Sequence, residues 1–272
     1  MLSFIRKEND VITQIEEGYN LDIDYYNNRV DKLKNEYNEH ICRFRRQRCI
    51  VEKSLVHLRK EYELVKEKNN EFSDIFEKIK NRPEYKYKNI NMIEFTWLPT
   101  QIDDVFEIEK FKHYEADLLD NPMIAIVSFH GFFKRKLFEY ELKEFKEKVI
   151  KLEGEVNNSI YEIHNILTFL NNIGNLVTDF NLNLSKIRTV YSNNIYKLSK
   201  IIENKIDYNN FSKSERLVLE NTVLLSDILF RMLKIRIINR SEKNKINKQE
   251  IDIFINNTKR TLKANNIDID NW

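Results

Sequence analysis

Two stretches of this chain carry apolar residues at strict seven-residue spacing, and this pattern constrains the fold more than any other feature. The first stretch has an apolar residue at all nine heptad positions: Ile23, Val30, Tyr37, Phe44, Val51, Leu58, Val65, Phe72 and Ile79. The second is equally long: Leu142, Val149, Val156, Ile163, Leu170, Val177, Leu184, Tyr191 and Leu198. Apolar heptads form a stripe along one helix face that is buried by supercoiling against another helix. We therefore expect two long helices that pair through these stripes.

The scarcity of turn-forming residues supports long helices. The 272 residues include only 4 Gly and 3 Pro, and none of these lies between Tyr19 and Arg82. This predicts one helix of about 60 residues, roughly 90 Å long at 1.5 Å per residue, which Pro83 ends. Within it, the companion apolar positions shift by one residue at Tyr26 and Leu33. Such a slip is typical of a stutter in the heptad repeat.

The direction of pairing follows from the cost of leaving either stripe in water. The nearest stripe of equal length lies in the same chain, so we predict an intramolecular antiparallel pair. The predicted fold is all-α: an elongated antiparallel two-helix coiled coil with a small cap at one end and a helical base at the other. The same stripes could also pair between chains, so a parallel or swapped dimer stays open. The predicted parts are an N-terminal segment packing on the base (1–20), the first long helix (21–81), the distal cap (82–136), the second long helix (137–203) and the C-terminal base (207–272).

Local signals mark elements in the cap and the base. Thr100 with Asp103 predicts the start of a short cap helix that continues to Leu119. Ser212 with Glu215 forms a capping-box pattern before a stripe of apolar residues that reaches about residue 238. The polar stretch 241–248 is predicted to be a loop. A last helix is predicted from four apolar residues: Ile251, Phe254, Ile255 and Leu262.

Motifs for chemistry are lacking in the sequence. Four scattered glycines make neither a P-loop nor a dinucleotide-binding pattern, and no histidine follows a glutamate by three positions. Cys42 and Cys49 lie seven residues apart on one predicted helix, beyond disulfide reach, and match no zinc-ligand spacing. The acidic run Asp103, Asp104, Glu107 and Glu109 fits the first turns of a helix, where carboxylates complement the dipole. We predict no enzymatic activity, no cofactor and no metal.

An apolar segment in the predicted cap is the first candidate contact site. It combines apolar residues with a basic cluster, and its members are Met123, Ile124, Ile126, Val127, Phe129, Phe132, Phe133, Lys134, Arg135 and Lys136. Apolar residues beside basic ones are typical of a membrane-surface helix. The same residues could equally form the small core of the cap. The sequence therefore leaves a partner-protein site, a membrane contact and a cap core as alternatives.

A basic cluster on the first long helix is the second candidate. Arg43, Arg45 and Arg46 could contact phosphate groups. Consecutive helix residues point around the whole circumference, however, and the formal net charge of the chain is only +2. A solvated helix face is therefore the competing interpretation, and we do not expect nucleic acid as a partner.

The order of these elements resembles that of a known group of proteins. A heptad helix, an apolar middle and a second long helix precede the stretch DYNNFSKSERLVLENTVLLSDILFRMLKIRII at 207–238. Over residues 30–80 and 138–255 this is similar to uncharacterised bacterial coiled-coil proteins sometimes labelled chemotaxis-like. The resemblance implies a long Gly/Ala-rich apolar hairpin that inserts into membranes, whereas this chain has the short PMIAIVSFHGFF at 122–133. It supplies no catalytic residues.

We therefore predict a non-enzymatic coiled-coil interaction or scaffold protein that presents its cap and base to protein partners. The alternative is a membrane-active helical protein, similar to α-helical pore formers, that uses the apolar segment 122–133. The N-terminus does not match a secretory signal, because Arg6 interrupts its apolar start, and no apolar run is long enough to span a bilayer. With its thiols expected to be reduced, the protein is predicted to be cytoplasmic and, through the cap, peripheral to a membrane.

Overall fold

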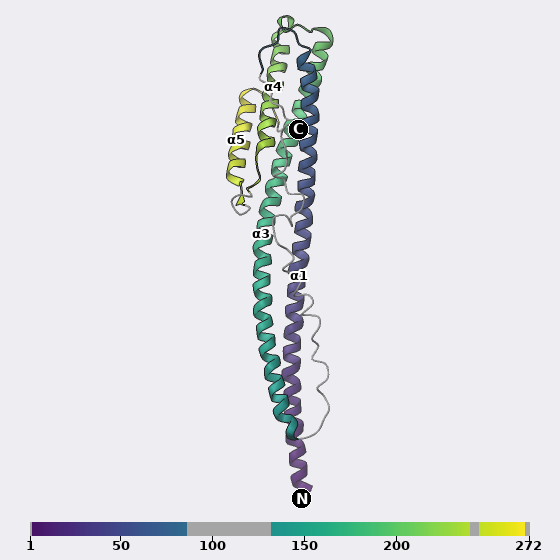
Figure 1. Cartoon of the computed structure of the whole chain (residues 1–272), viewed down its shortest axis with the longest axis vertical. Coiled ribbons are helices and arrows are strands. Elements are labelled where there is room, and N and C mark those ends of the chain that lie inside the picture. The colour runs from purple at the N-terminus through teal and green to yellow at the C-terminus, as the bar shows by residue number, and fades with distance from the viewer. Residues whose placement is uncertain (1, 86–131, 240–244, 270–272) are drawn as a thin grey trace. The chain divides into compact units, whose positions relative to one another are not determined.

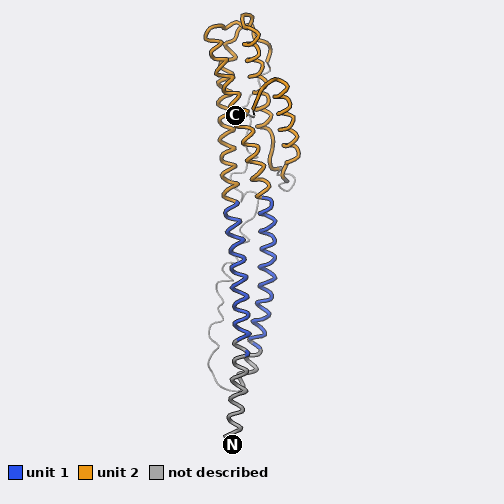
Figure 2. The backbone as a smooth tube through the Cα atoms, turned by 180° about the vertical axis from the view of Figure 1, so that it is seen from behind, with its two compact units in different colours: residues 1–47, 107–169 blue, residues 48–106, 170–272 orange. Residues whose placement is uncertain are grey.

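The computed structural model describes residues 2–85, 132–239 and 245–269, and these are almost entirely helical (Figure 1). The elements in chain order are α1 (Leu2–Glu77), α3 (Phe132–Asn204), the 3-10 helix η4 (Tyr208–Asn210), α4 (Lys213–Lys234), β1 (Ile238–Asn239), β2 (Lys245–Ile246) and α5 (Lys248–Ala264). The predicted all-α class is confirmed. The chain divides into two compact units: unit 1 holds residues 1–47 and 107–169, and unit 2 holds 48–106 and 170–272 (Figure 2).

Both predicted stripes form the buried seam of the long helices. In α3 all nine members are buried, with Leu142 the most exposed at 6%. In the first stripe the seven members from Tyr37 to Ile79 are buried, while Ile23 and Val30 are half-buried. Burying a large aliphatic or aromatic side chain stabilises the fold by about 1.5–3 kcal/mol. The two stripes are therefore the main source of helix pairing.

In unit 1 the two helices run in the same direction. Lys146 Nζ donates to Asp22 Oδ2 at 2.9 Å, and seven residues further along both helices Arg29 forms a bidentate ion pair with Glu153. The ring of Tyr26 meets that of Phe145 edge-on, with centroids 6.2 Å apart. Because the residue numbers of the partners increase together along both helices, the two helices are parallel.

The helices of unit 2 are parallel as well. Arg188 Nε donates to Glu61 Oε2 at 2.6 Å, and Tyr191 Oη donates to Asn69 Oδ1 at 3.3 Å. At the end of the pair, Lys80 N donates to Ile206 O at 2.8 Å. The bridge between Lys80 and Asp207 is parallel. The predicted antiparallel direction is therefore wrong.

The sequence does not determine whether the two long helices pair in parallel or antiparallel. A heptad stripe identifies the buried face of a helix, and it is compatible with either direction of its partner. A connection of roughly 54 residues between Glu77 and Phe132 can span roughly 180 Å, at about 3.3 Å per residue, so its length permits both directions. The predicted placement of the base beside residues 1–20 rested on antiparallel pairing. The parallel direction of the helices removes the argument for this placement. Residues 2–20 are the first part of α1.

The companion positions of α1 shift where the sequence predicts a stutter. Leu33, Tyr37 and Ile41 are all buried, so two four-residue steps follow one another along α1. The pairing of the two helices keeps its spacing: Tyr26 meets Phe145 in unit 1 and Phe72 meets Tyr191 in unit 2, and each pair is 119 positions apart.

Hydrogen bonds made by residues 78–82, rather than Pro83 itself, define the end of α1. Lys78 N and Ile79 N donate to the carbonyls three residues before them, which tightens the last turn. Asn81 then adopts a left-handed conformation with φ of 53°, and Arg82 Nη1 donates to the carbonyls of Glu77 and Ile79. The helix therefore ends at Glu77, earlier than the predicted boundary at 81. It also begins at Leu2, far earlier than the predicted 21.

In unit 2 the base consists of α4, a two-stranded hairpin and α5. The capping box at Ser212 is confirmed, and α4 ends at Lys234, before the predicted residue 238. Part of the predicted loop 241–248 is strand, because β2 pairs antiparallel with β1, with Ile246 opposite Ile238. The last helix is confirmed as α5, whose Ile251 and Leu262 are buried.

Candidate functional site

The ends of α1 and α3 meet in unit 2 at a surface that we call the base junction, residues 79–82 and 204–217. Its framework is a pair of backbone hydrogen bonds, from Lys80 N to Ile206 O (2.8 Å) and from Tyr208 N to Lys80 O (3.0 Å). Asn81 Nδ2 adds a hydrogen bond of 3.0 Å to Asp207 Oδ2. These contacts fix the chain reversal after α3 to the end of α1.

Asp207 holds the start of η4. Its Oδ1 accepts from Asn209 N at 2.9 Å, while its other oxygen accepts from Asn81. The backbone donor of Asn209, and after it the Asn81 amide, lower the pKa of the Asp207 carboxyl. The ionised carboxylate is therefore the form that stabilises this turn.

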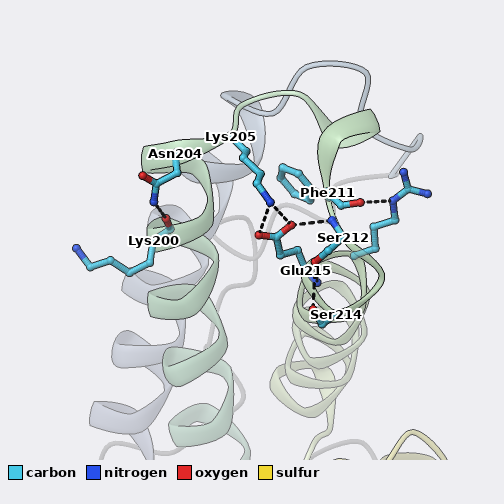
Figure 3. Close-up of polar contacts among 8 residues, drawn as sticks. Lys200, Asn204, Lys205, Phe211, Ser212, Ser214 and Glu215 are labelled. Atoms are coloured by element: carbon cyan, nitrogen blue, oxygen red, sulfur yellow. Dashed lines mark hydrogen bonds and ion pairs between the residues drawn. The ribbon is translucent and has the colours of Figure 1, made fainter.

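The N-terminus of α4 is capped by a three-residue network, drawn in Figure 3. Ser212 Oγ accepts from Glu215 N at 3.3 Å, and Glu215 Oε2 accepts from Ser212 N at 2.7 Å. Lys205 Nζ donates to both Glu215 oxygens at 3.0 Å. The Ser212 backbone donor, followed by Lys205, lowers the pKa of the Glu215 carboxyl. The network links the segment after α3 to the first turn of α4.

Arg216 closes the loop between η4 and α4. Its Nε donates to Phe211 O at 3.1 Å, its Nη2 donates to Asn209 O at 3.2 Å, and its guanidinium lies 4.9 Å from the centre of the Tyr208 ring. Phe211 itself is buried. The Arg216 side chain therefore stabilises the loop by donating hydrogen bonds to its backbone carbonyls.

Exposed apolar side chains occur at the base junction and elsewhere in the base. Ile206 is 48% exposed, Leu217 51% and Ile253 of α5 54%. A shallow groove between α3, α4 and α5 is lined by residues such as Ile187, Met232 and Phe254, and it has no space that would hold a water molecule. Within the described part of the chain no cluster of three His, Cys, Asp or Glu residues could hold a metal ion. The large apolar side chains that this surface exposes are Ile206, Leu217 and Ile253.

A buried polar contact joins three helices below the base junction. Asn69 Oδ1 accepts from Tyr191 Oη at 3.3 Å and from Ser226 Oγ at 2.9 Å. All three residues are buried, with Ser226 at 3%. A single Asn in an apolar seam specifies register and partner helix. No sequence motif predicts this role, and the available signal is a lone Asn among mostly apolar companion positions.

The structure places the predicted basic cluster on the outside of α1. Arg43, Arg45 and Arg46 are all exposed. Arg43 forms an ion pair with Glu39 on its own helix, with side chains 61% and 62% exposed. This geometry matches the competing interpretation of a solvated helix face, and phosphate contact stays a prediction.

Most of the predicted apolar segment lies outside the described residues, namely Met123, Ile124, Ile126, Val127 and Phe129. Phe132, Phe133, Lys134, Arg135 and Lys136 belong to the first turns of α3, and their side chains lie outside the described part. The acidic run 103–109 and the cap helix predicted from Thr100 also lie outside it. A contact role for this segment stays a prediction.

The two cysteines are both free and exposed. This agrees with their predicted spacing along one helix, which keeps them apart.

Paired long helices with a helical base define the class of this protein, an all-α helical bundle. Comparison with models of protein families, with curated proteins and with solved structures finds no match to the chain. Among the described residues, no helix is both long and apolar enough to cross a lipid bilayer.

Proposed function

We propose that this chain is a non-enzymatic coiled-coil interaction protein that presents its base, together with the segment 82–131, to partner proteins. One observation carries the proposal. In unit 2, α4 is anchored to both long helices through Asn69, so that the base is a fixed part of the bundle. The exposed Ile206, Leu217 and Ile253 of this base are apolar groups of the kind that protein interfaces cover. Its free exposed thiols favour the reducing cytoplasm as its location.

The test compares capture of partners by wild type and by a base variant. The variant carries Leu217→Asp and Ile253→Asp, and the control carries Val56→Asp, since Val56 on α1 is 64% exposed. We expect a partner that is enriched by wild type and by the control and is lost with the base variant. That partner, purified, should form a complex with wild type in size-exclusion chromatography.

Two results would contradict this proposal. One is equal capture by wild type and the base variant, provided that both retain wild-type helicity by circular dichroism. The other is a purified partner that binds without residues 204–269. A second variant with residues 86–131 replaced by a flexible linker shows whether that segment contributes to the same complex.

A further inference from the structure

The chain turns back sharply at the end of α5. Asn266 adopts a left-handed conformation with φ of 56°, and Ile267 N donates to Leu262 O at 2.9 Å. Asn266 N donates to Lys263 O at 3.1 Å, which completes the hydrogen-bond pattern of a Schellman motif. Ile267 and Leu262 are both buried, as is typical of this motif. Residues 267–269, the tail, therefore pack back on unit 2 instead of continuing in the direction of the helix.

The tail ends at the shallow groove between α3, α4 and α5. Ile269, the last described residue, lines this groove together with Ile187, Met232, Phe254 and Ile255. Ile187, Met232 and Ile269 are buried, whereas Phe254 and Ile255 are only half-buried. The described residues therefore leave part of these two large side chains of α5 uncovered beside the end of the tail. Because the groove has no room for a water molecule, it suits a flat apolar group that lies across it.

The chain itself supplies such a group within reach of the groove. Trp272 follows Ile269 by three residues, so its backbone lies no more than about 10 Å from that of Ile269, at about 3.3 Å per residue. Asp270 and Asn271 between them are residue types that favour turns. A four-residue turn brings its first and last Cα atoms within about 7 Å of each other. A turn over residues 269–272 would therefore return Trp272 to the groove.

The short connection favours this tryptophan over a separate molecule as the occupant of the groove. A group joined to its site by a short link is present there at an effective concentration in the millimolar range. Burying a tryptophan side chain removes about 150–250 Å² of surface from water, among the largest areas that one residue provides. Since Ile269 already lines the groove, the contact of Trp272 would extend an existing packing surface.

Two polar residues of the groove also match an indole ring. Asn183 of α3 donates through Nδ2 to Asp179 O at 2.7 Å, which leaves its Oδ1 as an acceptor for the indole N–H. Lys259 of α5 is exposed, and an ammonium group can lie over the face of an indole. The groove thus combines apolar walls, a hydrogen-bond acceptor and a cation, and tryptophan is the side chain that uses all three.

From these observations we infer that the groove between α3, α4 and α5 is the docking site of Trp272 of the same chain, and that this contact ties α5 to α3 and α4. The contact is separate from the exposed Ile206, Leu217 and Ile253 of the proposed function. It does not depend on a partner protein, so either proposal can fail without the other.

Tryptophan fluorescence of the full chain tests the inference. The chain has 2 Trp, so Trp97→Phe leaves Trp272 as the only one. We expect acrylamide to quench its emission several-fold less in the folded protein than in urea. Ile255→Asp in the groove should remove this protection, whereas Ile253→Asp, exposed on the same helix and outside the groove lining, should not. Equal quenching of folded and unfolded protein overturns the inference, and so does protection that Ile255→Asp leaves intact.

A double-mutant cycle tests the same contact without placing a charge in the groove. Trp272→Ala and Ile255→Ala should each lower the free energy of unfolding, and together they should lower it by less than the sum, because both changes remove one contact. Trp272→Ala with Ile253→Ala is the control pair, whose effects should add. Additive effects in both pairs would show that Trp272 does not meet the groove and would overturn the inference.

Discussion

Ser226 of α4 donates a hydrogen bond of 2.9 Å to Asn69 of α1, and both residues are buried. The same Asn69 oxygen accepts from Tyr191 of α3. One amide thus joins the parallel pair to the base. In an interior of low dielectric such a contact is worth most when every group is paired, and it disfavours any shift of α4 along the long helices.

The first prediction concerns this contact. Ser226→Ala should lower the free energy of unfolding by about 1 kcal/mol, and Asn69→Ala by about 2–4 kcal/mol, since the second change also leaves a cavity. A double-mutant cycle measured by urea denaturation should give a coupling of about 1 kcal/mol. Ser54→Ala is the control, because Ser54 Oγ bonds only to its own helix at Ile50 O in this structure. Additive effects of Ser226→Ala and Asn69→Ala would mean that the hydrogen bond contributes nothing.

The second prediction concerns the direction of the long helices. Asn81 and Asp207 are joined by a side-chain hydrogen bond of 3.0 Å. With Cys42 and Cys49 changed to Ser, the pair Asn81→Cys and Asp207→Cys should form a disulfide within one chain. Asn81→Cys with Leu137→Cys should not, because those two would be neighbours only in an antiparallel pair. Non-reducing electrophoresis with mass spectrometry measures both, and the reverse result would restore the antiparallel direction.

The third prediction uses the ion pair between Glu61 and Arg188, whose side chains are only 16% and 20% exposed. Arg188→Glu should destabilise unit 2 by about 1–3 kcal/mol, because it places two carboxylates side by side. Adding Glu61→Arg should recover at least half of that loss. Chemical denaturation of wild type and of the two variants at low salt measures both effects. A second change that recovers nothing would show that the two residues do not meet in solution.

The fourth prediction concerns pH. The pKa of Glu215 is lowered in the folded chain, so its contribution is present above the pKa of the unfolded chain, near 4.3, and is lost as the pH falls through the lower native value. Glu215→Gln should therefore lower the urea midpoint at pH 7 and have a much smaller effect near pH 2.5. Glu220→Gln, an exposed position on the same helix, is the control for removing one charge. An effect of Glu215→Gln that does not change with pH would exclude the carboxylate as the cap.

Several features of the fold followed from local sequence. The heptad stripes identified the buried faces of α1 and α3, because apolar spacing reports which side of a helix must leave water. Ser212 with Glu215 identified the start of α4, because a capping box is complete within four residues. The stutter near Tyr37 was also visible, since it changes only the spacing along one helix. Each of these features depends on neighbours in the chain.

The sequence by itself determined that long helices pair through two stripes. Only the tertiary structure decided that they pair in parallel, because an apolar stripe is compatible with either direction of its partner. The contacts that define the direction join residues more than 100 positions apart. The tertiary structure likewise decided that Asn69 meets Tyr191 and Ser226. In the sequence, Asn69 marks only a polar interruption of an apolar series. Its partners are fixed by how α3 and α4 pack on α1.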